Sequence, residues 1–414
     1  MRIQSAFLRA LLLLAIPGFL AYADEAKNDL AAKKNPGLTL PEAVATFTQS
    51  NPHTKILEGR LAATRAELRQ SQLLPNPEVI WRIEDSVDND NFVEASWPVD
   101  VSGRRWLKSK AAMAGIVSAE RLYQWELNSL LADVKTLFFE VVACQERLRI
   151  AEEGAGRYAS ILNNLRGRAG QTDFDRLRLE KELAEVKADA AEAQRELHRL
   201  RIEFAILLNE DPHAFRLAAD LKPARALPSR ETLEGSILSD HPKVASALKA
   251  VERRDLERRA ARRKWIPEIT VSGGFKNTSG DDVNKSGFAG EISIAIPIFD
   301  AGQEELAAAK GELKAAESEA VIAKTEVMRR FAETYEDAVL VANSAREYET
   351  ALLTADRVEQ MAGLAYLEGR LGTLELLDAY SGAIKTRTRY IALTLESCIL
   401  EIELERIIGR PIDS

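Results

Sequence analysis

Two long stretches without proline limit the folds that this chain can adopt. One lies between Pro98 and Pro212 and the other between Pro297 and Pro411, and the two are equal in length. A helix over residues 302–368, inside the second stretch, would be roughly 100 Å long at about 1.5 Å of rise per residue. A compact domain does not need a helix of that length. We therefore expect an elongated molecule whose helices span a distance.

The two stretches indicate a tandem duplication, which is the first feature to seek because a repeat fixes the architecture. Matching glycines and prolines recur at one constant offset: Gly103 with Gly302, Gly170 with Gly369, and Pro212 with Pro411. A slightly shorter offset upstream pairs Asn51-Pro52 with His241-Pro242 and Pro77 with Pro267. We predict a first repeat over residues 24–212, a linker over 213–228, a second repeat over 229–411 and a C-terminal tail over 412–414.

Each repeat predicts the same series of elements. A short helix (40–50; 229–239) precedes a longer one (52–74; 242–264), and prolines then lead into two strands (77–85 and 92–98; 267–276 and 287–297). A helical hairpin follows over 103–208 or 302–408, with its turn near Gly170 or Gly369. Apolar residues in the long helices recur at alternating steps of three and four, which is typical of a coiled coil. These residues are Leu127, Leu130, Val134, Leu137, Val141, Cys144, Leu148 and Ala151, and Leu306, Ala309, Leu313, Ala316, Ala320, Ala323 and Val327.

The predicted strands alternate apolar and polar residues, as a wall between lipid and water does. Val79, Trp81 and Ile83 share one face of the first strand, and Phe288, Ile292 and Ile294 share one face of the fourth. After the N-terminal segment, no run approaches the roughly 18–20 apolar residues of a membrane-spanning helix. Contact with a membrane would therefore be made by strands. Four strands cannot close a barrel, and open edges are costly in lipid, so several copies would have to share one.

Residues 1–23 predict a signal peptide. Arg2 and Arg9 precede an apolar run that ends in Ala21-Tyr22-Ala23, and cleavage would follow Ala23. Removing it changes the formal net charge from -8 to about -10, which argues against nucleic acid as a partner. No cysteine follows the apolar run, so we expect no lipid anchor there.

No motif indicates catalysis or a cofactor. The histidines are scattered and no pair has metal-ligand spacing: His53, His198, His213 and His241. No nucleophile-elbow or phosphate-loop pattern occurs. We therefore expect neither an enzyme nor a metal-binding or cofactor-binding site. Cys144 and Cys398 lie on predicted helical seams, either as small hydrophobic side chains or as a bonded pair.

The order of motifs resembles that of the TolC-like outer-membrane efflux factors of Gram-negative bacteria. The motifs are LTLPEAVATFTQSNP, LLPNPEV, SWPVDVSGRR, WIPEITVSGGF, AIPIFDAGQ and AYLEGRLGTLELLDAY. The resemblance implies a mainly α fold with a small β part, in which a homotrimer shares a twelve-stranded barrel in outer-membrane lipid and extends a coiled-coil tunnel through the periplasm. It also implies two partners, a periplasmic adaptor (membrane fusion protein) and an inner-membrane RND-type pump. The chain is most similar to the branch for cobalt, zinc and cadmium, with multidrug and protein-secretion ducts as alternatives.

The resemblance also implies roles for particular residues. Glu375 and Asp378 match acids that constrict the tunnel, although acids near a helix N-terminus are also ordinary. A latch would join Tyr366 to Asp173 or Asp175, with Arg370 beside it, whereas a packed tyrosine on a coiled-coil seam is the simpler alternative. The expected adaptor contacts are Arg168, Ala169, Gly170, Arg370, Leu371 and Gly372, and the expected strand-helix junctions are Pro98, Gly103, Pro297 and Gly302.

A different class of protein would share the helical hairpins. A periplasmic coiled-coil adaptor or scaffold would show the same seams, but it has no reason to display two pairs of strands with lipid-facing alternation. The strands therefore favour a duct that carries substrates from the periplasm to the outside.

Overall fold

The computed structural model describes residues 37–85, 89–165, 173–212, 216–279 and 284–412. The predicted signal peptide and the turn that contains Arg168, Ala169 and Gly170 lie outside these ranges. The first half contains α2 (Leu40–Ser50), α3 (Pro52–Gln72), β1 (Glu78–Asp85), β2 (Asn89–Val99), α4 (Arg104–Leu165) and α5 (Asp173–Leu208). The second half contains α6 (Arg230–Asp240), α7 (Pro242–Arg262), β3 (Glu268–Ser279), β4 (Asn284–Ala295), α8 (Gln303–Leu367) and α9 (Thr373–Ile408). The predicted helices and strands are thus all present, and their order is the same in both halves.

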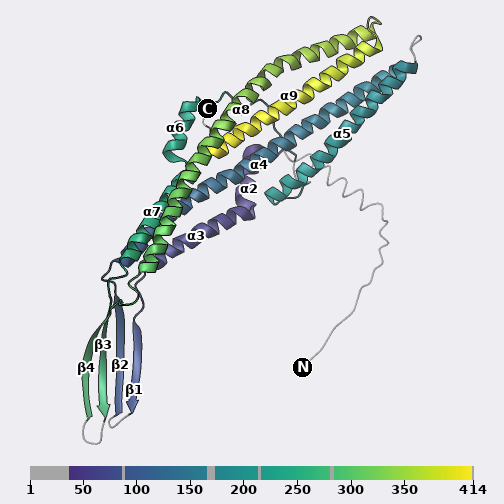
Figure 1. Ribbon diagram of the computed structural model, residues 1–414. Helices are drawn as coiled ribbons and strands as arrows, with labels where there is room; N and C mark the ends of the chain where they lie inside the picture. Colours follow the sequence, from purple (N-terminus) through teal and green to yellow (C-terminus); the bar gives the residue numbers. More distant parts are fainter. Residues whose placement is uncertain (1–36, 86–88, 166–172, 213–215, 280–283, 413–414) are drawn as a thin grey trace, which may run out of the picture.

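The molecule is elongated, with the sheet at one end and, at the other, the C-terminal ends of α4 and α8 beside the N-terminal ends of α5 and α9 (Figure 1). The long helices α4 and α8 run from the sheet to the far end, while α3 and α7 lie beside them in the half nearest the sheet. Helix α4 has 62 residues and α8 has 65. Within the described ranges, no helix combines the length and the apolar character that crossing a membrane requires.

The predicted coiled-coil seams are buried. On α8, Ala309, Ala316, Ala320 and Ala323 are all buried, and these small side chains let the neighbouring helices approach closely.

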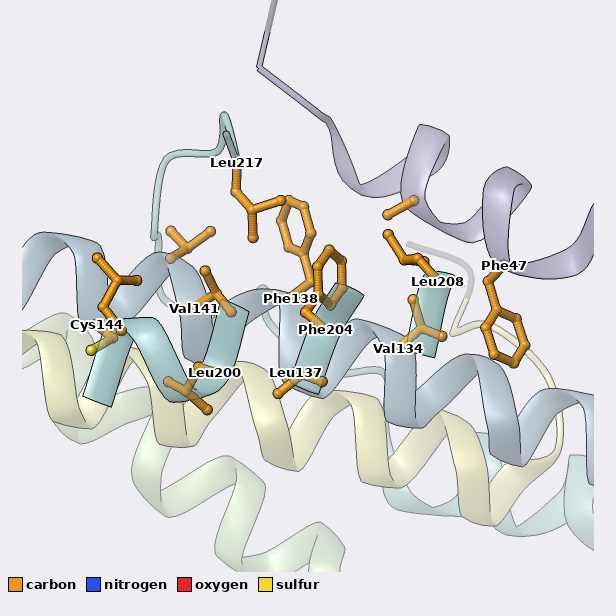
Figure 2. Close-up of a cluster of buried hydrophobic side chains, with 13 residues drawn as sticks. Phe47, Val134, Leu137, Phe138, Val141, Cys144, Leu200, Phe204, Leu208 and Leu217 are labelled. Carbon is orange, nitrogen blue, oxygen red and sulfur yellow. The ribbon is translucent and has the colours of Figure 1, made fainter. Parts of the chain in front are cut away.

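The larger core lies where α2, α4 and α5 meet. Figure 2 shows Phe47, Phe138 and Phe204 there, together with Leu208 and Val134. The rings of Phe138 and Phe204 pack edge to face with centroids 6.1 Å apart, a favourable aromatic geometry.

Both cysteines are free and buried. The Cys144 thiol donates to the carbonyl of Ala193 at 3.4 Å, and the Cys398 thiol donates to the carbonyl of Lys222 at 3.3 Å. Burial raises the pKa of both thiols, that of Cys398 to about 11, so both stay protonated. Cys144 and Cys398 are therefore small buried side chains and not a bonded pair.

The sheet is antiparallel in the order β1-β2-β3-β4, and its register collects the apolar side chains on one face. Trp81 pairs with Val93, Val93 with Phe275, and Phe275 with Phe288, which makes an apolar row across all four strands. Trp81 is 70% and Phe288 93% exposed, so none of the described residues covers the two ends of the row. The opposite face is mostly polar, with Ile80 and Phe92 as exceptions, and there Lys276 Nζ lies 2.5 Å from Asp90 Oδ2.

The predicted strand-helix junctions depend on glycines with positive φ. Gly103 (φ 64°) and Gly302 (φ 85°) each precede a long helix in the left-handed region that glycine adopts without strain. A Cβ on Gly302 would lie 2.6 Å from the Lys264 side chain, so close approach also requires glycine there. Pro98 lies within β2 and Pro297 follows β4.

Asn51 and His241 occupy matching positions of the duplication, and they make equivalent hydrogen bonds in the two halves. The Asn51 side chain accepts from His53 N–H at 2.7 Å and donates to the Leu207 carbonyl at 2.6 Å. His241 Nδ1 accepts from Val244 N–H at 3.4 Å, and Nε2 lies 2.6 Å from the Ile407 carbonyl, to which it donates. Each side chain therefore caps a helix and ties it to the end of a hairpin. His241 is 2% exposed, and burial lowers its pKa.

The His241 cap predicts a pH-dependent stability. Because the folded pKa lies below the ordinary value of 6.5, the unfolded chain binds the proton first as the pH falls. The contribution of His241 is thus fully present above pH 6.5 and decreases below it. Thermal melting at pH 8 and pH 5.5 should show a smaller loss of Tm for His241→Asn than for the unchanged chain, because asparagine reproduces the cap of the first half without titrating. His53→Asn, at an exposed position, is the control. Equal losses of Tm for His241→Asn and the unchanged chain would contradict the prediction.

Candidate functional site

The turn between α8 and α9 is closed by main-chain hydrogen bonds. Gly369 has φ 76°, its N–H donates to the Tyr366 carbonyl at 3.1 Å, and the Arg370 N–H donates to the Ala365 carbonyl at 2.8 Å. This is the Schellman arrangement in which a glycine ends a helix. Gly372 has φ -77° and ψ 166°, so it is extended and does not need the conformational freedom of glycine. Positive φ therefore explains Gly369 but not Gly372.

The two proposed gate acids are exposed on one face of the first turns of α9. Glu375 and Asp378 are exposed, with the Glu375 carboxylate folded back toward Gly372, while Leu376 and Leu377 between them are buried. The three-residue spacing predicted from the sequence does place both carboxylates on the same side of the helix. No salt bridge joins either of them to a basic side chain of the described residues.

The residues of the predicted latch are in different environments. Tyr366 is 6% exposed and packs with Tyr158, Leu179 and Leu376 in an apolar cluster below the turn. Asp173 is highly exposed, with Oδ1 3.9 Å from Arg176 Nε, and Asp175 is half-buried. Arg370 is exposed and pairs with Glu368 in its own turn at 3.2 Å. A link from Tyr366 to either aspartate remains a prediction.

A buried ion cluster joins the two hairpins further from the turn. Glu359 of α8 is 5% exposed and accepts from both Arg157 of α4 and Arg387 of α9. Arg387 Nη2 also donates to Asp356 Oδ1 at 2.6 Å. Glu359 thus holds cations from two other helices, and removing it would leave two guanidinium groups without their shared partner.

Sequence reasoning missed this cluster. Its four charges come from three helices, and each lies among other charged residues that a sequence assigns to solvated faces. Only the packing of α4 against α8 and α9 distinguishes Glu359 from an exposed acid such as Glu333, whose side chain is 59% exposed. No periodicity signal separates the two residues.

A second set of ion pairs joins the hairpins at the opposite end of α9. Lys135 Nζ of α4 lies 2.5 Å from Glu405 Oε2 of α9, and Arg406 of α9 pairs with Asp133 of α4. Together with the Glu359 cluster, these pairs tie α4 to α9 near both ends of their contact.

The described residues hold no group of three or more His, Cys, Asp or Glu side chains that could bind a metal ion.

Comparison with known proteins gives one family and several relatives. Residues 233–410 match the family model described as "Outer membrane efflux protein". The cobalt-zinc-cadmium resistance protein CzcC of Cupriavidus metallidurans is 25% identical over 382 residues, with 90% of each chain covered. The cation efflux system protein CusC of Escherichia coli K12 is 25% identical over 332 residues, covering 77% of this chain and 72% of CusC.

Solved structures show the same fold. The open state of the MtrE outer membrane channel of Neisseria gonorrhoeae matches with a TM-score of 0.73 at 19% identity, covering 90% of this chain and 89% of that one. The outer-membrane channel OprN matches with a TM-score of 0.72 at 21% identity, covering 89% of both chains. The fold is therefore TolC-like, as the sequence predicted.

The Glu359 cluster predicts that a single substitution, Glu359→Gln, lowers the free energy of unfolding substantially. Glu359→Gln removes the charge between Arg157 and Arg387 and should lower the free energy of unfolding by about 3 kcal/mol, as breaking a buried ion pair does. Glu333→Gln on the same helix breaks only the exposed pair with Arg329 and should cost about 0.5 kcal/mol or less. Thermal melting followed by circular dichroism compares the two. Equal, small effects would show that the cluster does not hold the hairpins together.

Proposed function

Because the chain belongs to the TolC-like outer membrane efflux protein family, we propose that it is the outer-membrane duct of a tripartite efflux system for heavy-metal cations. It is an outer-membrane efflux channel protein and not an enzyme. In this proposal three copies form one passive duct from the periplasm to the outside, and an inner-membrane RND-type pump supplies the energy and the choice of substrate. A periplasmic adaptor joins the pump to the hairpin turns.

The unpaired edges and the exposed apolar face of the sheet are the main support for a trimer. Strands β1 and β4 each pair on one side only within the described chain, and the apolar row from Trp81 to Phe288 is uncovered. Unpaired backbone groups cost several kcal/mol each in lipid, so the edges need partners. Pairing β4 of one copy with β1 of the next removes every edge. Three copies would supply twelve strands, which leave a wider lumen than the eight strands of two copies.

The relatives support cations as the substrate. One is named a cobalt-zinc-cadmium resistance protein and another a cation efflux system protein. A periplasmic adaptor or scaffold is the alternative from another class, and the four-stranded sheet with its apolar face argues against it.

Two experiments test this function. Deletion of the gene should lower the minimal inhibitory concentrations of zinc, cobalt or cadmium and leave those of a panel of drugs unchanged. Increased sensitivity to drugs alone would favour a multidrug duct.

Fractionation should place a heat-modifiable trimer in outer membranes. A soluble monomer in the periplasm would contradict the duct.

We also propose that Glu375 and Asp378 form the periplasmic constriction of the duct. In a trimer the two exposed acids of each copy would place six carboxylates around one axis, and such a ring attracts cations and repels anions. Their position on the uncovered face of α9, without a basic partner among the described residues, supports this role.

The gate predicts a change in ion selectivity. Glu375→Gln with Asp378→Asn should lower the cation preference of the channel in planar bilayers and weaken its block by divalent cations, because the ring loses its charge. Glu333→Gln with Asp337→Asn, two acids of α8, is the control with the same change in charge. Unchanged selectivity in the first variant would exclude Glu375 and Asp378 from the constriction.

A further inference from the structure

The exposed residues of α9 lie on a single stripe. They are Leu374, Glu375, Asp378, Gly382, Lys385, Arg389, Ala392 and Glu396, and every other residue of this helix is buried or half-buried. After Leu374 their spacing alternates between three and four, so all of them share one side of the helix. We call this side the α9 stripe. It is the face of α9 that the described part of the chain leaves uncovered.

The α9 stripe has the composition of a solvent-exposed surface. Five of its eight residues are charged, and Leu374 is its only large apolar residue. The exposed side of α8 differs, because it presents Leu353, Met361, Leu364 and Leu367, each more than half exposed. Exposed apolar residues of this kind suit contact with another copy. The charged stripe suits a water-filled space.

Within the described residues, no salt bridge involves a charge of the α9 stripe. Other helices of this chain do pair such charges along one face, as Arg149 does with Glu146 and Glu153. In the described residues, neither Lys385 nor Arg389 takes part in a salt bridge, although both lie on a helix whose Arg387 is fully engaged by Asp356 and Glu359. Their charges are therefore available to mobile ions.

The sign of the charge changes along the stripe. Asp378 and Lys385 are seven residues apart in the sequence, or roughly 10 Å along the helix. This is about one Debye length at physiological salt, so the acidic pair and the basic pair act on ions as separate layers.

We propose that Lys385 and Arg389 form a basic belt in the lumen, directly beyond the acid constriction, and that the belt sets the ion selectivity of the open duct. This inference rests on the proposed duct, in which the charged and water-exposed α9 stripe faces the axis. In a trimer the belt has six positive charges. It attracts small inorganic anions and opposes the passage of bare cations, so cations cross this level with anions beside them.

The test measures reversal potentials of the purified trimer in planar bilayers under a potassium chloride gradient. Lys385→Gln with Arg389→Gln should raise the ratio of cation to anion permeability by roughly threefold or more, since the lumen loses positive charge at this level. Lys385→Arg with Arg389→Lys keeps the charge and should keep the ratio. Lys187→Gln with Arg195→Gln removes two exposed charges from α5 and should also leave the ratio unchanged.

The outcomes separate the belt from the gate. If Glu375→Gln with Asp378→Asn changes the ratio and the Lys385 and Arg389 variant does not, the belt is overturned and the gate stands. If only the Lys385 and Arg389 variant changes the ratio, the belt stands without the gate. If the α5 variant changes the permeability ratio as much as the belt variant does, the change in the ratio results from the net charge of the protein and not from the position of Lys385 and Arg389. The belt is then also overturned.

Discussion

The unpaired edges of the sheet are the constraint on which the rest of the structure depends. A single chain supplies four strands with an apolar face, and within its described residues nothing covers that face or the outer edges of β1 and β4. Lipid can cover the apolar side chains but cannot bond to the backbone. In the proposed duct, other copies of the chain do so. Sharing the strands in this way would bring the helices that continue from β2 and β4 through Gly103 and Gly302 into one bundle, and their length would carry the lumen away from the membrane.

The two hairpins of one chain are held together by charge as well as by apolar packing. Small alanines on the seam of α8 permit close helix approach, but they contribute little buried area each. Glu359, buried between Arg157 and Arg387, adds a contact that requires all three helices to be in place at once. Such a contact resists sliding of one hairpin past the other, because any displacement leaves buried charge without a partner. The exposed pairs that cover the outer surfaces have no such effect.

The duplicated halves have diverged where function is expected. Asn51 and His241 keep the same pair of hydrogen bonds with different chemistry, so the structural role survived the exchange. The segments after the hairpin turns differ more, since the first repeat has Arg176 and Leu179 at the positions that match Glu375 and Asp378. The α9 stripe continues from these acids to Lys385 and Arg389, so this helix carries both the proposed constriction and the proposed belt.

The sequence by itself determined the elements, their order and the faces of the strands. Proline-free stretches, positive-φ glycines and the periods of two and 3.6 are local signals, and each acts through the backbone of a few residues. It also placed Glu375 and Asp378 on one side of a helix. Only the tertiary structure decided which of many charged helical residues are buried, because burial depends on a neighbouring helix far away in the sequence. Glu359 and Glu333 look alike in the sequence, and Lys385 looks like any solvated lysine. Packing against α4 made Glu359 a link between the hairpins, whereas none of the described residues packs over the side of α9 that carries Lys385, which is therefore exposed.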